Sequence, residues 1–562
     1  MTRRTTTGTG SLRRQRQRAI AASGVSVAAL VVAMATAQAQ TLPPLPPGTP
    51  PYVKEMWRSA LSAPQPFGAS PGVISPYLPQ SFVTPDPNGT LGTYQTSGPL
   101  VTGTNPFFQS LGTNGRACST CHIPEQGMGV STAAIQQRFA QSGPRDPIFA
   151  PVDGANCPSA VSSWNTMPSH FGGHVGRGTY GNHQSDPYSL IMSRGVFRIF
   201  LPVPAGADYT IKVVHDPYGC NTDPTYAQTT DETGKVTQII SVYRRPKVST
   251  NLPFVTVNGG NIMWDGREPT LRSQALDATR GHAQATQDPT DDQLAQIVAF
   301  ESQFFSGQQS VWPWLDLTSG GAQGGPKFLS TVTPTGLGTG GGPPPARGTS
   351  IFNAWSTVTG SSPTAQMQQS IYRGQQIFNN TTFQVTNVDT PGPNFGLDGF
   401  NPPGSGGTCT SCHGQPQSGD DLIPQAQHDI GVSGDNPMFG GPVPQMDLPI
   451  FQVTCTAAAL LPPTTTGGFG PPPVNDLPAA ATAANNYTVY TNDPGLALIS
   501  GHCADVGRST VPNLRGMASR APFFHDGSAQ TMMDVVNFYN KRFAIGLTAQ
   551  QKQDLVNFLN AL

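Results

Sequence analysis

Two five-residue stretches constrain this chain more than any other feature. Residues 118–122 and 409–413 both read Cys-x-x-Cys-His, which is the attachment pattern of a c-type haem. Two thiols three residues apart can form thioethers with the two vinyl groups of one porphyrin, and the adjacent histidine can then ligate the iron. A thioredoxin-like pair does not need this histidine, and a zinc site would need a second Cys or His pair nearby. We therefore expect two covalently bound haem c groups, held by Cys118, Cys121, His122, Cys409, Cys412 and His413.

The N-terminal residues have the pattern of an export signal. A basic region at 13–18 precedes an apolar run at 19–35, and Ala37-Gln38-Ala39 supplies a small-x-small cleavage site. The apolar run is short for a bilayer span, and we found no other stretch long and apolar enough to cross a membrane. The sequence thus predicts a signal peptide over 1–39 and a periplasmic or secreted product that is free of the membrane after cleavage.

Composition limits the class of protein. Charged residues make up only 11% of the chain and the net charge is -1, so there is no electrostatic footprint for a nucleic-acid partner. The 63 glycines and 56 prolines predict long irregular segments around a small helical core. We expect a mainly α fold of two cytochrome c-like haem domains, with long Pro/Gly-rich loop insertions and a few short strands.

Four cysteines remain outside the haem motifs, and in an oxidising compartment they are expected to pair. Four cysteines allow three connectivities. We favour Cys157 with Cys220 and Cys455 with Cys503, because each pair then closes a loop within one half of the chain.

Turn residues and a Gly/Pro-rich stretch divide the chain into expected domains. Strand-like runs occur at 209–215 and 236–243. The expected order after the signal peptide is an irregular N-terminal arm at 40–100, an N-terminal haem c domain at 101–318 with an insertion at 130–243, a linker at 319–348, and a C-terminal haem c domain at 349–562 with an insertion at 414–500.

Helix signals are clearest in the second half. Ser362 can cap a helix that has Pro363 at its first position, and Met367, Ile371, Gly374 and Phe378 then fall on one face. A capping box of Thr548 and Gln551 opens a final helix with a leucine stripe. Gly374 would let this last helix approach closely. We also expect a helix at about 290–305, and we expect 105–108 to pack on the edge of the first haem.

Three further motifs carry a family resemblance. At Trp264–Arg267, Val511–Gly516 and Ala521–Ser528 the chain resembles the bacterial di-haem cytochrome c peroxidase superfamily, which includes MauG-type enzymes and di-haem rubber oxygenases. The resemblance covers both haem motifs, the Trp264 segment and the C-terminal segment, but neither the insertions nor the arm. It implies that peroxide or dioxygen reacts at the haem on His122, and that the haem on His413 relays electrons. Trp264 would lie between the haems as a relay; the alternative is a buried structural tryptophan.

The resemblance also suggests the second axial ligand of the C-terminal haem. Counting on from His525 of the His-Asp-Gly motif leads to Tyr539, where MauG-type enzymes carry tyrosine. A phenolate ligand would favour the ferric state and lower the potential. The alternative is that Tyr539 is simply packed and that the iron takes one of His525, Met517, Met532 or Met533.

The distal side of the first haem departs from the family. Gln274 matches the distal glutamine, but Gln284 stands where the family has its catalytic glutamate, and a carboxamide cannot titrate. His282 could take over proton transfer, or it could be a loop histidine bonded to backbone. The departure weakens a plain peroxidase assignment and favours dioxygen chemistry in an apolar pocket, whose wall we expect from Phe197, Ile199 and Phe200 of the insertion.

The family's calcium site is doubtful in this chain. Arg244 and Arg520 fall near the positions of the calcium contacts, and a guanidinium is a poor neighbour for a cation.

The leading interpretation is an exported di-haem c-type oxidoreductase that reduces hydrogen peroxide, with electrons relayed from the C-terminal to the N-terminal haem. The expected partners are a small cytochrome c or cupredoxin-type donor, peroxide or dioxygen, and, in a homodimer, a second copy of the chain. Two alternatives remain, a dioxygenase that cleaves an unsaturated apolar substrate and a non-enzymatic electron carrier.

Overall fold

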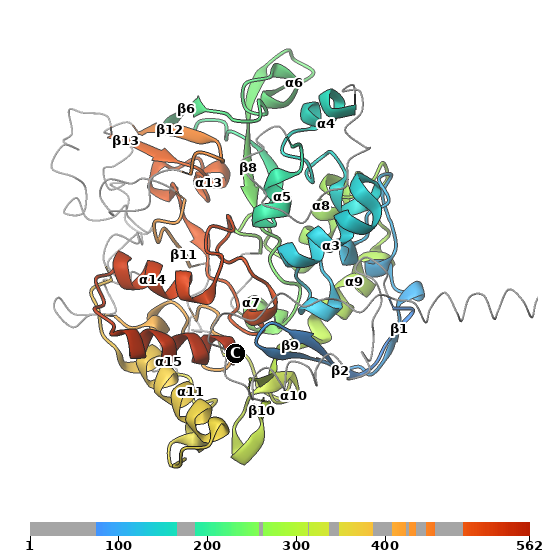
Figure 1. Cartoon of the computed structure of the whole chain (residues 1–562). Helices are drawn as coiled ribbons and strands as arrows, with labels where there is room; N and C mark the ends of the chain where they lie inside the picture. Colours follow the sequence, from blue (N-terminus) through green and yellow to red (C-terminus); the bar gives the residue numbers. More distant parts are fainter. Residues whose placement is uncertain are drawn as a thin grey trace, which may run out of the picture. The chain divides into compact units, whose positions relative to one another are not determined.

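A computed structural model describes residues 75–165, 186–257, 262–312, 314–335, 348–385, 407–422, 426–433, 445–455 and 487–562 (Figure 1). The expected signal peptide and most of the expected arm lie outside these residues, so export stays a prediction. The described residues all belong to one compact unit. Within the described part of the chain, no helix has the length and apolarity needed to cross a membrane.

Helices occur along the whole described chain. Their bounds are α3 (Thr132–Ser142), α4 (Pro158–Asn165), α5 (Ser189–Arg194), α6 (Pro224–Ala227), α7 (Leu252–Thr256), α8 (Leu271–Gly281), α9 (Asp291–Gln303), α10 (Gly325–Leu329), α11 (Pro363–Asn380), α13 (Ala497–Ser500), α14 (Met532–Arg542) and α15 (Ala549–Asn560).

Strands are more numerous than we expected from the sequence, and the described residues form five sheets. The largest has the strand order β10 (Leu315–Asp316), β9 (Phe304–Val311), β3 (Gly89–Gln95) and β2 (Ser81–Asp86). Two three-stranded sheets have the orders β13 (Tyr487–Thr491), β12 (Ile450–Cys455), β6 (Tyr209–His215) and β5 (Phe197–Pro202), β8 (Val236–Arg244), β7 (Gln228–Thr230). Two two-stranded sheets pair β1 (Tyr77–Leu78) with β4 (Leu100–Val101) and β11 (Gln427–His428) with β14 (Ser509–Thr510). The prediction of a mainly α fold is therefore wrong.

The physical reason for this error lies in the two insertions. We predicted strands at 209–215 and 236–243, and they form β6 and most of β8. However, β6 of the first insertion pairs with β12 of the second, with Ile211 opposite Val453, so the insertions form a joint sheet instead of separate loops. This pairing is non-local and leaves little local signal. The expected disulfides Cys157–Cys220 and Cys455–Cys503 are both confirmed.

The N-terminal arm and the linker also contain regular structure. Strands β2 and β3 form a hairpin that joins β9, so residues 81–95 are not irregular. Residues 319–335 include α10, and Pro326 of this helix lies under Gly92 of β3, where a Cβ would meet the proline ring at 2.8 Å. The first part of the expected linker is therefore folded, and residues 336–347 lie outside the described residues.

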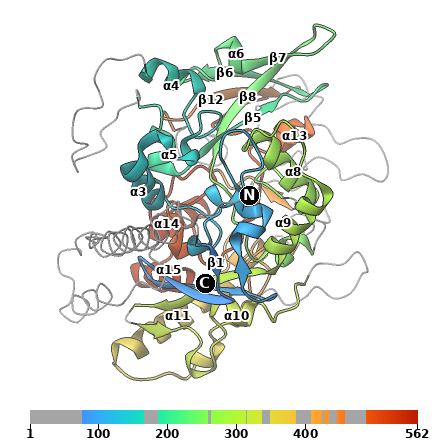
Figure 2. The ribbon, with the colours of Figure 1, turned by 90° about the vertical axis from the view of Figure 1, so that its right-hand side faces the viewer.

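The helix predictions for the second half are confirmed. The Ser362 hydroxyl accepts from the Ala365 amide at the start of α11, and Thr548 and Gln551 form the capping box of α15. These two helices lie side by side in both views (Figures 1 and 2). At their closest approach, a Cβ on Gly374 would lie 2.0 Å from the carbonyl oxygen of Asp554, so only glycine fits. The crossing forms the centre of a buried cluster that includes Phe378 and Phe558.

Candidate active site

The first haem motif is held in a short 3₁₀ turn, Cys118–Thr120. The Nδ1–H of His122 donates to the Met128 carbonyl at 3.0 Å and lies 3.2 Å from the Ser249 hydroxyl. This arrangement leaves Nε2 available to ligate iron. Burial lowers the pKa of His122 to about 4, so the imidazole is neutral, which is the form that binds a metal.

The second motif has the same construction. Its turn is Cys409–Ser411, and Nδ1–H of His413 donates to the Gly419 carbonyl at 2.7 Å. In each motif the accepting carbonyl lies six residues after the histidine and belongs to a residue with positive φ, +58° at Met128 and +75° at Gly419. The two loops therefore orient their histidines in the same way. The sequence does not reveal this similarity, because methionine rarely adopts this conformation.

The cysteines of both motifs lie outside the disulfides. None of Cys118, Cys121, Cys409 and Cys412 is in a disulfide. Burial raises the pKa of Cys118 and Cys409 to about 12 and that of Cys121 to about 11, so the folded chain holds them as neutral thiols. Phe107, in the segment expected at the haem edge, lies with its ring centroid 6.5 Å from that of His122.

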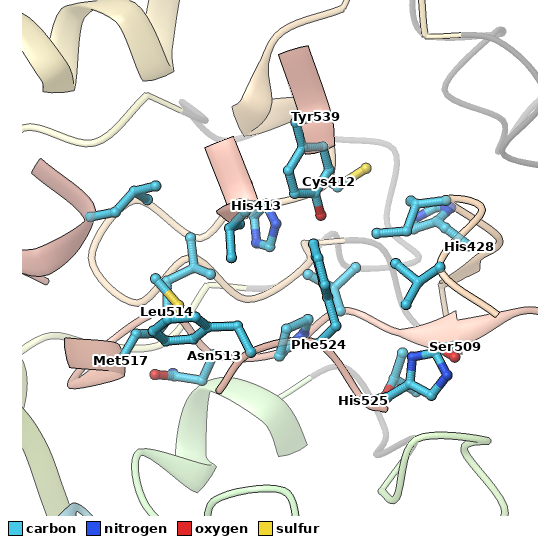
Figure 3. Close-up of a pocket in the computed structure, with 18 of the residues that line it drawn as sticks. Cys412, His413, His428, Ser509, Asn513, Leu514, Met517, Phe524, His525 and Tyr539 are labelled. Carbon is cyan, nitrogen blue, oxygen red and sulfur yellow. The ribbon is translucent and has the colours of Figure 1, made fainter. Parts of the chain in front are cut away.

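Each motif opens into its own cavity. The first cavity is lined by Cys118, Cys121 and His122 together with Gln274 and His282. The second is lined by Cys409, Cys412, His413 and Tyr539. Figure 3 shows the Tyr539 ring beside the His413 imidazole, with its hydroxyl directed into the same space. The two cavities share one wall, formed by residues 245–248 together with Leu252, Ile262 and Trp264.

Three cations that form no ion pair among the described residues line these cavities; Arg245 is buried, and Lys247 and Arg520 are partly buried. Arg245 and Lys247 line both cavities and Arg520 lines the second. Arg245 donates to three backbone carbonyls, Arg520 to two, and Lys247 to the Thr510 hydroxyl; no ion pair of these three is recorded within the described chain. Burial lowers the pKa of Lys247 to about 8 and that of Arg245 to about 9.

A buried cation without an anionic partner is costly, and each haem carries two carboxylates that would supply the missing negative charge. The thiols, the oriented histidines and these cations together fit two haem c groups.

Trp264 lies in the shared wall. Its Nε1–H donates to the Arg245 carbonyl at 2.7 Å, which fixes the plane of the indole. The Lys247 ammonium lies 5.4 Å from the ring centroid and the His525 ring 5.9 Å from it. The tryptophan therefore stands beside both cavities.

The candidate axial ligands differ in their surroundings. Tyr539 and Met517 line the second cavity, whereas Met532 and Met533 do not. His525 also lines it, but its Nε2 lies 3.2 Å from the Ser433 hydroxyl and 3.8 Å from an Asp493 carboxylate oxygen. Burial raises the pKa of Tyr539.

The distal residues of the first cavity are only partly as expected. Gln274 lies on α8 and His282 follows the last residue of that helix; both line the cavity. Gln284 does not, and its carbonyl accepts from the Thr113 hydroxyl. His282 is bonded through Nδ1 to the carboxylate of Asp153 at 2.5 Å, instead of to backbone as the alternative held.

The expected aromatic wall is also only partly formed. Phe197 and Ile199 line the first cavity. Phe200 is 41% exposed and does not line it; its ring packs against the Arg198 guanidinium at 4.5 Å. Alternate residues of a strand point to opposite faces, so Phe200 cannot share the inward face of its β5 neighbour Ile199.

Two buried ionisable groups in the cavity walls were not predicted from the sequence. Glu301 lines the first cavity and His428 the second; they are 3% and 4% exposed. Among described residues, Oε2 of Glu301 and Nδ1 of His428 have no hydrogen-bond partner. A lone Glu in a helix and a lone His in a two-residue strand carry no sequence signal for such a position.

The residues near the expected calcium contacts do not fit a calcium ion. Arg244 is 3% exposed and forms ion pairs with both Asp265 and Asp493. These carboxylates are already neutralised by a guanidinium, so they are poor ligands for a second cation.

Comparison with known proteins supports the resemblance. No family model matches the chain. It is 30% identical over 165 residues to the cytochrome-c peroxidase IdrP1 of Pseudomonas sp. (strain SCT), covering 27% of this chain and 36% of that protein. It is 34% identical over 90 residues to the cytochrome-c peroxidase IdrP2 of Denitromonas iodatirespirans, covering 15% of this chain and 24% of that protein.

A crystal structure of a MauG-like protein associated with microbial copper homeostasis aligns with a TM-score of 0.28 and 16% identity, over 60% of this chain and 78% of that one. The matches to the two cytochrome-c peroxidases span well under half the length of those curated relatives. In its motifs and over these partial matches, the chain is similar to bacterial cytochrome-c peroxidases.

Proposed function

We propose that this chain is a di-haem c-type oxidoreductase that reduces hydrogen peroxide, converting H₂O₂, two protons and two electrons into two molecules of water. The observation that carries the proposal is the pair of cavities, each with a Cys-x-x-Cys-His motif, separated by a wall that contains Trp264. The cytochrome-c peroxidases among its relatives support the choice of peroxide as substrate.

Cys118 and Cys121 would bind one haem covalently and Cys409 and Cys412 the other, with His122 and His413 as proximal ligands. Tyr539 is the proposed second ligand in the second cavity. When bound, the haem irons supply the redox chemistry that cleaves the O–O bond. The backbone carbonyls on the two histidines hold them in the orientation that ligation requires.

In the first cavity, Gln274 offers amide N–H donors that can hold peroxide, and His282 is the proposed group that moves its proton. A titratable imidazole can take a proton from one peroxide oxygen and return it to the other, a task that the Gln284 carboxamide cannot perform. Trp264 would carry electrons between the cavities. A small cytochrome c or cupredoxin-type donor would supply these electrons in the periplasm or outside the cell.

A group of charged and proton-exchanging side chains in the wall of the first cavity favours peroxide over an unsaturated apolar substrate. Most of the lining is apolar, but it also contains Arg116, Asp153, His282 and Glu301. Cleavage of peroxide needs a group that takes up and returns a proton, whereas a pocket for a hydrocarbon does not. The dioxygenase alternative is therefore the weaker one.

The test compares wild type with two variants, Cys118→Ser/Cys121→Ser and Cys409→Ser/Cys412→Ser. Pyridine haemochrome assays are expected to give two haems per wild-type chain and one per variant. Stopped-flow mixing of the half-reduced wild type with hydrogen peroxide is expected to give a fast Soret change, followed by turnover with a small cytochrome donor. The second-motif variant is expected to keep the fast reaction but lose turnover, and the first-motif variant to lose both.

A wild type with two haems that is silent towards peroxide would overturn the proposal. Carbon monoxide binding to the reduced protein then separates the remaining alternatives. An electron carrier with two six-coordinate irons would not bind carbon monoxide, whereas a dioxygenase would.

A further inference from the structure

We propose that Asp153 and Arg116 position His282 so that its Nε2 accepts the peroxide proton in the first cavity. This inference rests on the proposed function and names residues outside the family motifs. Asp153 comes from the long insertion, and Arg116 immediately precedes the first haem motif. Through Asp153, the insertion would thus support the proton transfer that the family's catalytic glutamate performs and that Gln284 cannot perform here.

The three side chains form a connected set. Asp153 is 1% exposed; one carboxylate oxygen is engaged by Nη1 of Arg116, and the other lies 2.5 Å from Nδ1 of His282. Arg116 is itself fixed, because its Nε–H donates to the Pro147 carbonyl at 2.7 Å and its Nη2 to the Ile148 carbonyl at 2.8 Å. The Arg116 guanidinium is fixed by these backbone bonds and therefore holds the Asp153 carboxylate in one orientation.

The protonation states follow from this geometry. Burial alone would raise the pKa of Asp153, but the charge of Arg116 and the hydrogen bond from His282 outweigh burial and lower it. An ionised carboxylate only accepts hydrogen bonds, so Nδ1 of His282 must carry the proton. The lone pair is then on Nε2, for which the described residues provide no hydrogen-bond partner. This is the arrangement in which a buried aspartate sets the tautomer of a histidine base.

The backbone of His282 is also fixed relative to the haem motif. Its carbonyl accepts from the Asn114 side-chain amide at 2.7 Å, and the Thr113 amide donates to the next carbonyl, that of Ala283, at 3.1 Å. A Cβ on Gly112 would overlap the Ala283 carbonyl, so the two segments approach closely. The end of α8 and the residues before Cys118 therefore move together, and His282 keeps its place in the cavity wall.

The proposed step is balanced. Nε2 accepts a proton from one oxygen of H₂O₂, and Asp153 stabilises the imidazolium that forms. The same proton is then returned to the other oxygen, which leaves as water when the O–O bond breaks. Two protons from solvent and two electrons from the donor protein then convert the remaining oxygen into the second water. In this step Asp153 and Arg116 act through His282, so both are positioning residues.

The test uses the holoprotein and two ligands, one of which must lose a proton when it binds and one of which does not. Hydrogen cyanide must lose its proton to bind a ferric haem, whereas carbon monoxide binds a ferrous haem with no proton transfer. Asp153→Asn is expected to slow cyanide association and the peroxide reaction by about 10- to 100-fold. His282→Gln is expected to slow both by at least about 100-fold. Carbon monoxide association should be unchanged in both variants, whereas a merely distorted cavity would change it.

Two further variants sharpen the result. Asp288→Asn is the matched control, because Asp288 also pairs with an arginine near the end of α8 but is exposed; it should leave all three rates unchanged. In the double variant Asp153→Asn/His282→Gln, the loss should equal that of His282→Gln alone, because the two residues act as one unit.

Additive losses in the double variant, or an unchanged cyanide rate in Asp153→Asn, would overturn the inference while the wild type still reduced peroxide. If Asp153→Asn does not fold, Asp153→Glu keeps the charge for Arg116 but displaces the carboxylate, and the same slowing of cyanide is expected. A wild type inert to peroxide would instead refute the proposed function. The two failures are therefore distinguishable.

Discussion

A single methyl group at the crossing of α11 and α15 tests how the second cavity is built. In Gly374→Ala, the added Cβ would lie 2.0 Å from the Asp554 carbonyl oxygen and 2.6 Å from Cβ of Phe558. Both distances are far below van der Waals contact. The carbonyl belongs to a helix backbone and cannot rotate away, so the helices must separate.

The expected loss of unfolding free energy in Gly374→Ala follows from two opposing effects. Overpacking a core costs about 1–3 kcal/mol, and a clash with backbone places this site at the upper end, about 3 kcal/mol. Replacing glycine by alanine inside a helix returns about 1 kcal/mol. The variant should therefore lose about 2 kcal/mol of unfolding free energy. Phe378 of α11 lies 6.2 Å from the His413 ring, between centroids, so we also expect a change in the absorbance of the haem at that motif.

The assay is urea unfolding of the holoprotein followed by circular dichroism, with the Soret spectrum recorded on the same samples. Gly281→Ala is the matched control, since Gly281 ends α8 and a Cβ there meets nothing within 4 Å; its stability should stay equal or rise slightly. A Gly374→Ala variant as stable as wild type would refute the argument from close helix approach.

Three other predictions follow from buried charges and from the shared wall. Arg244→Met leaves Asp265 and Asp493 buried without their cation, so unfolding free energy in urea should fall by about 3–5 kcal/mol. Burial raises the pKa of Glu301 to about 7; wild-type stability should therefore decrease as pH rises from 5 through 7, whereas Glu301→Gln should show a flatter profile in denaturation series at each pH. Trp264→Phe should slow electron transfer between the two haems in stopped-flow reduction, with haem content unchanged; an unaltered rate would exclude the relay role.

The parts of the site that the sequence could predict are those whose signals are local. The spacing of Cys118, Cys121 and His122 is a property of five residues, and the structure shows these side chains around one cavity. Gln274 was matched to the family's distal glutamine by its distance in sequence from Trp264. Gln284 was matched in the same way, but it does not line the cavity, because α8 ends at Gly281 and the chain turns with φ +55° at Gln284.

The groups that complete the site could not be predicted, because they come together only through folding. Asp153 reaches His282 from 129 positions away in the chain, and nothing in either local sequence marks the pair. The same holds for Lys247, which lies at Trp264 and lines both cavities.

By itself, the sequence determined the two haem motifs and the caps of α11 and α15. These depend on residue type and short spacing, which act before any tertiary contact forms. The tertiary structure alone decided that the two insertions share a sheet, that Lys247 lines both cavities, and that Asp153 faces His282. Such contacts depend on how distant segments close on each other, and the free energy of that closure is not a property of either segment alone.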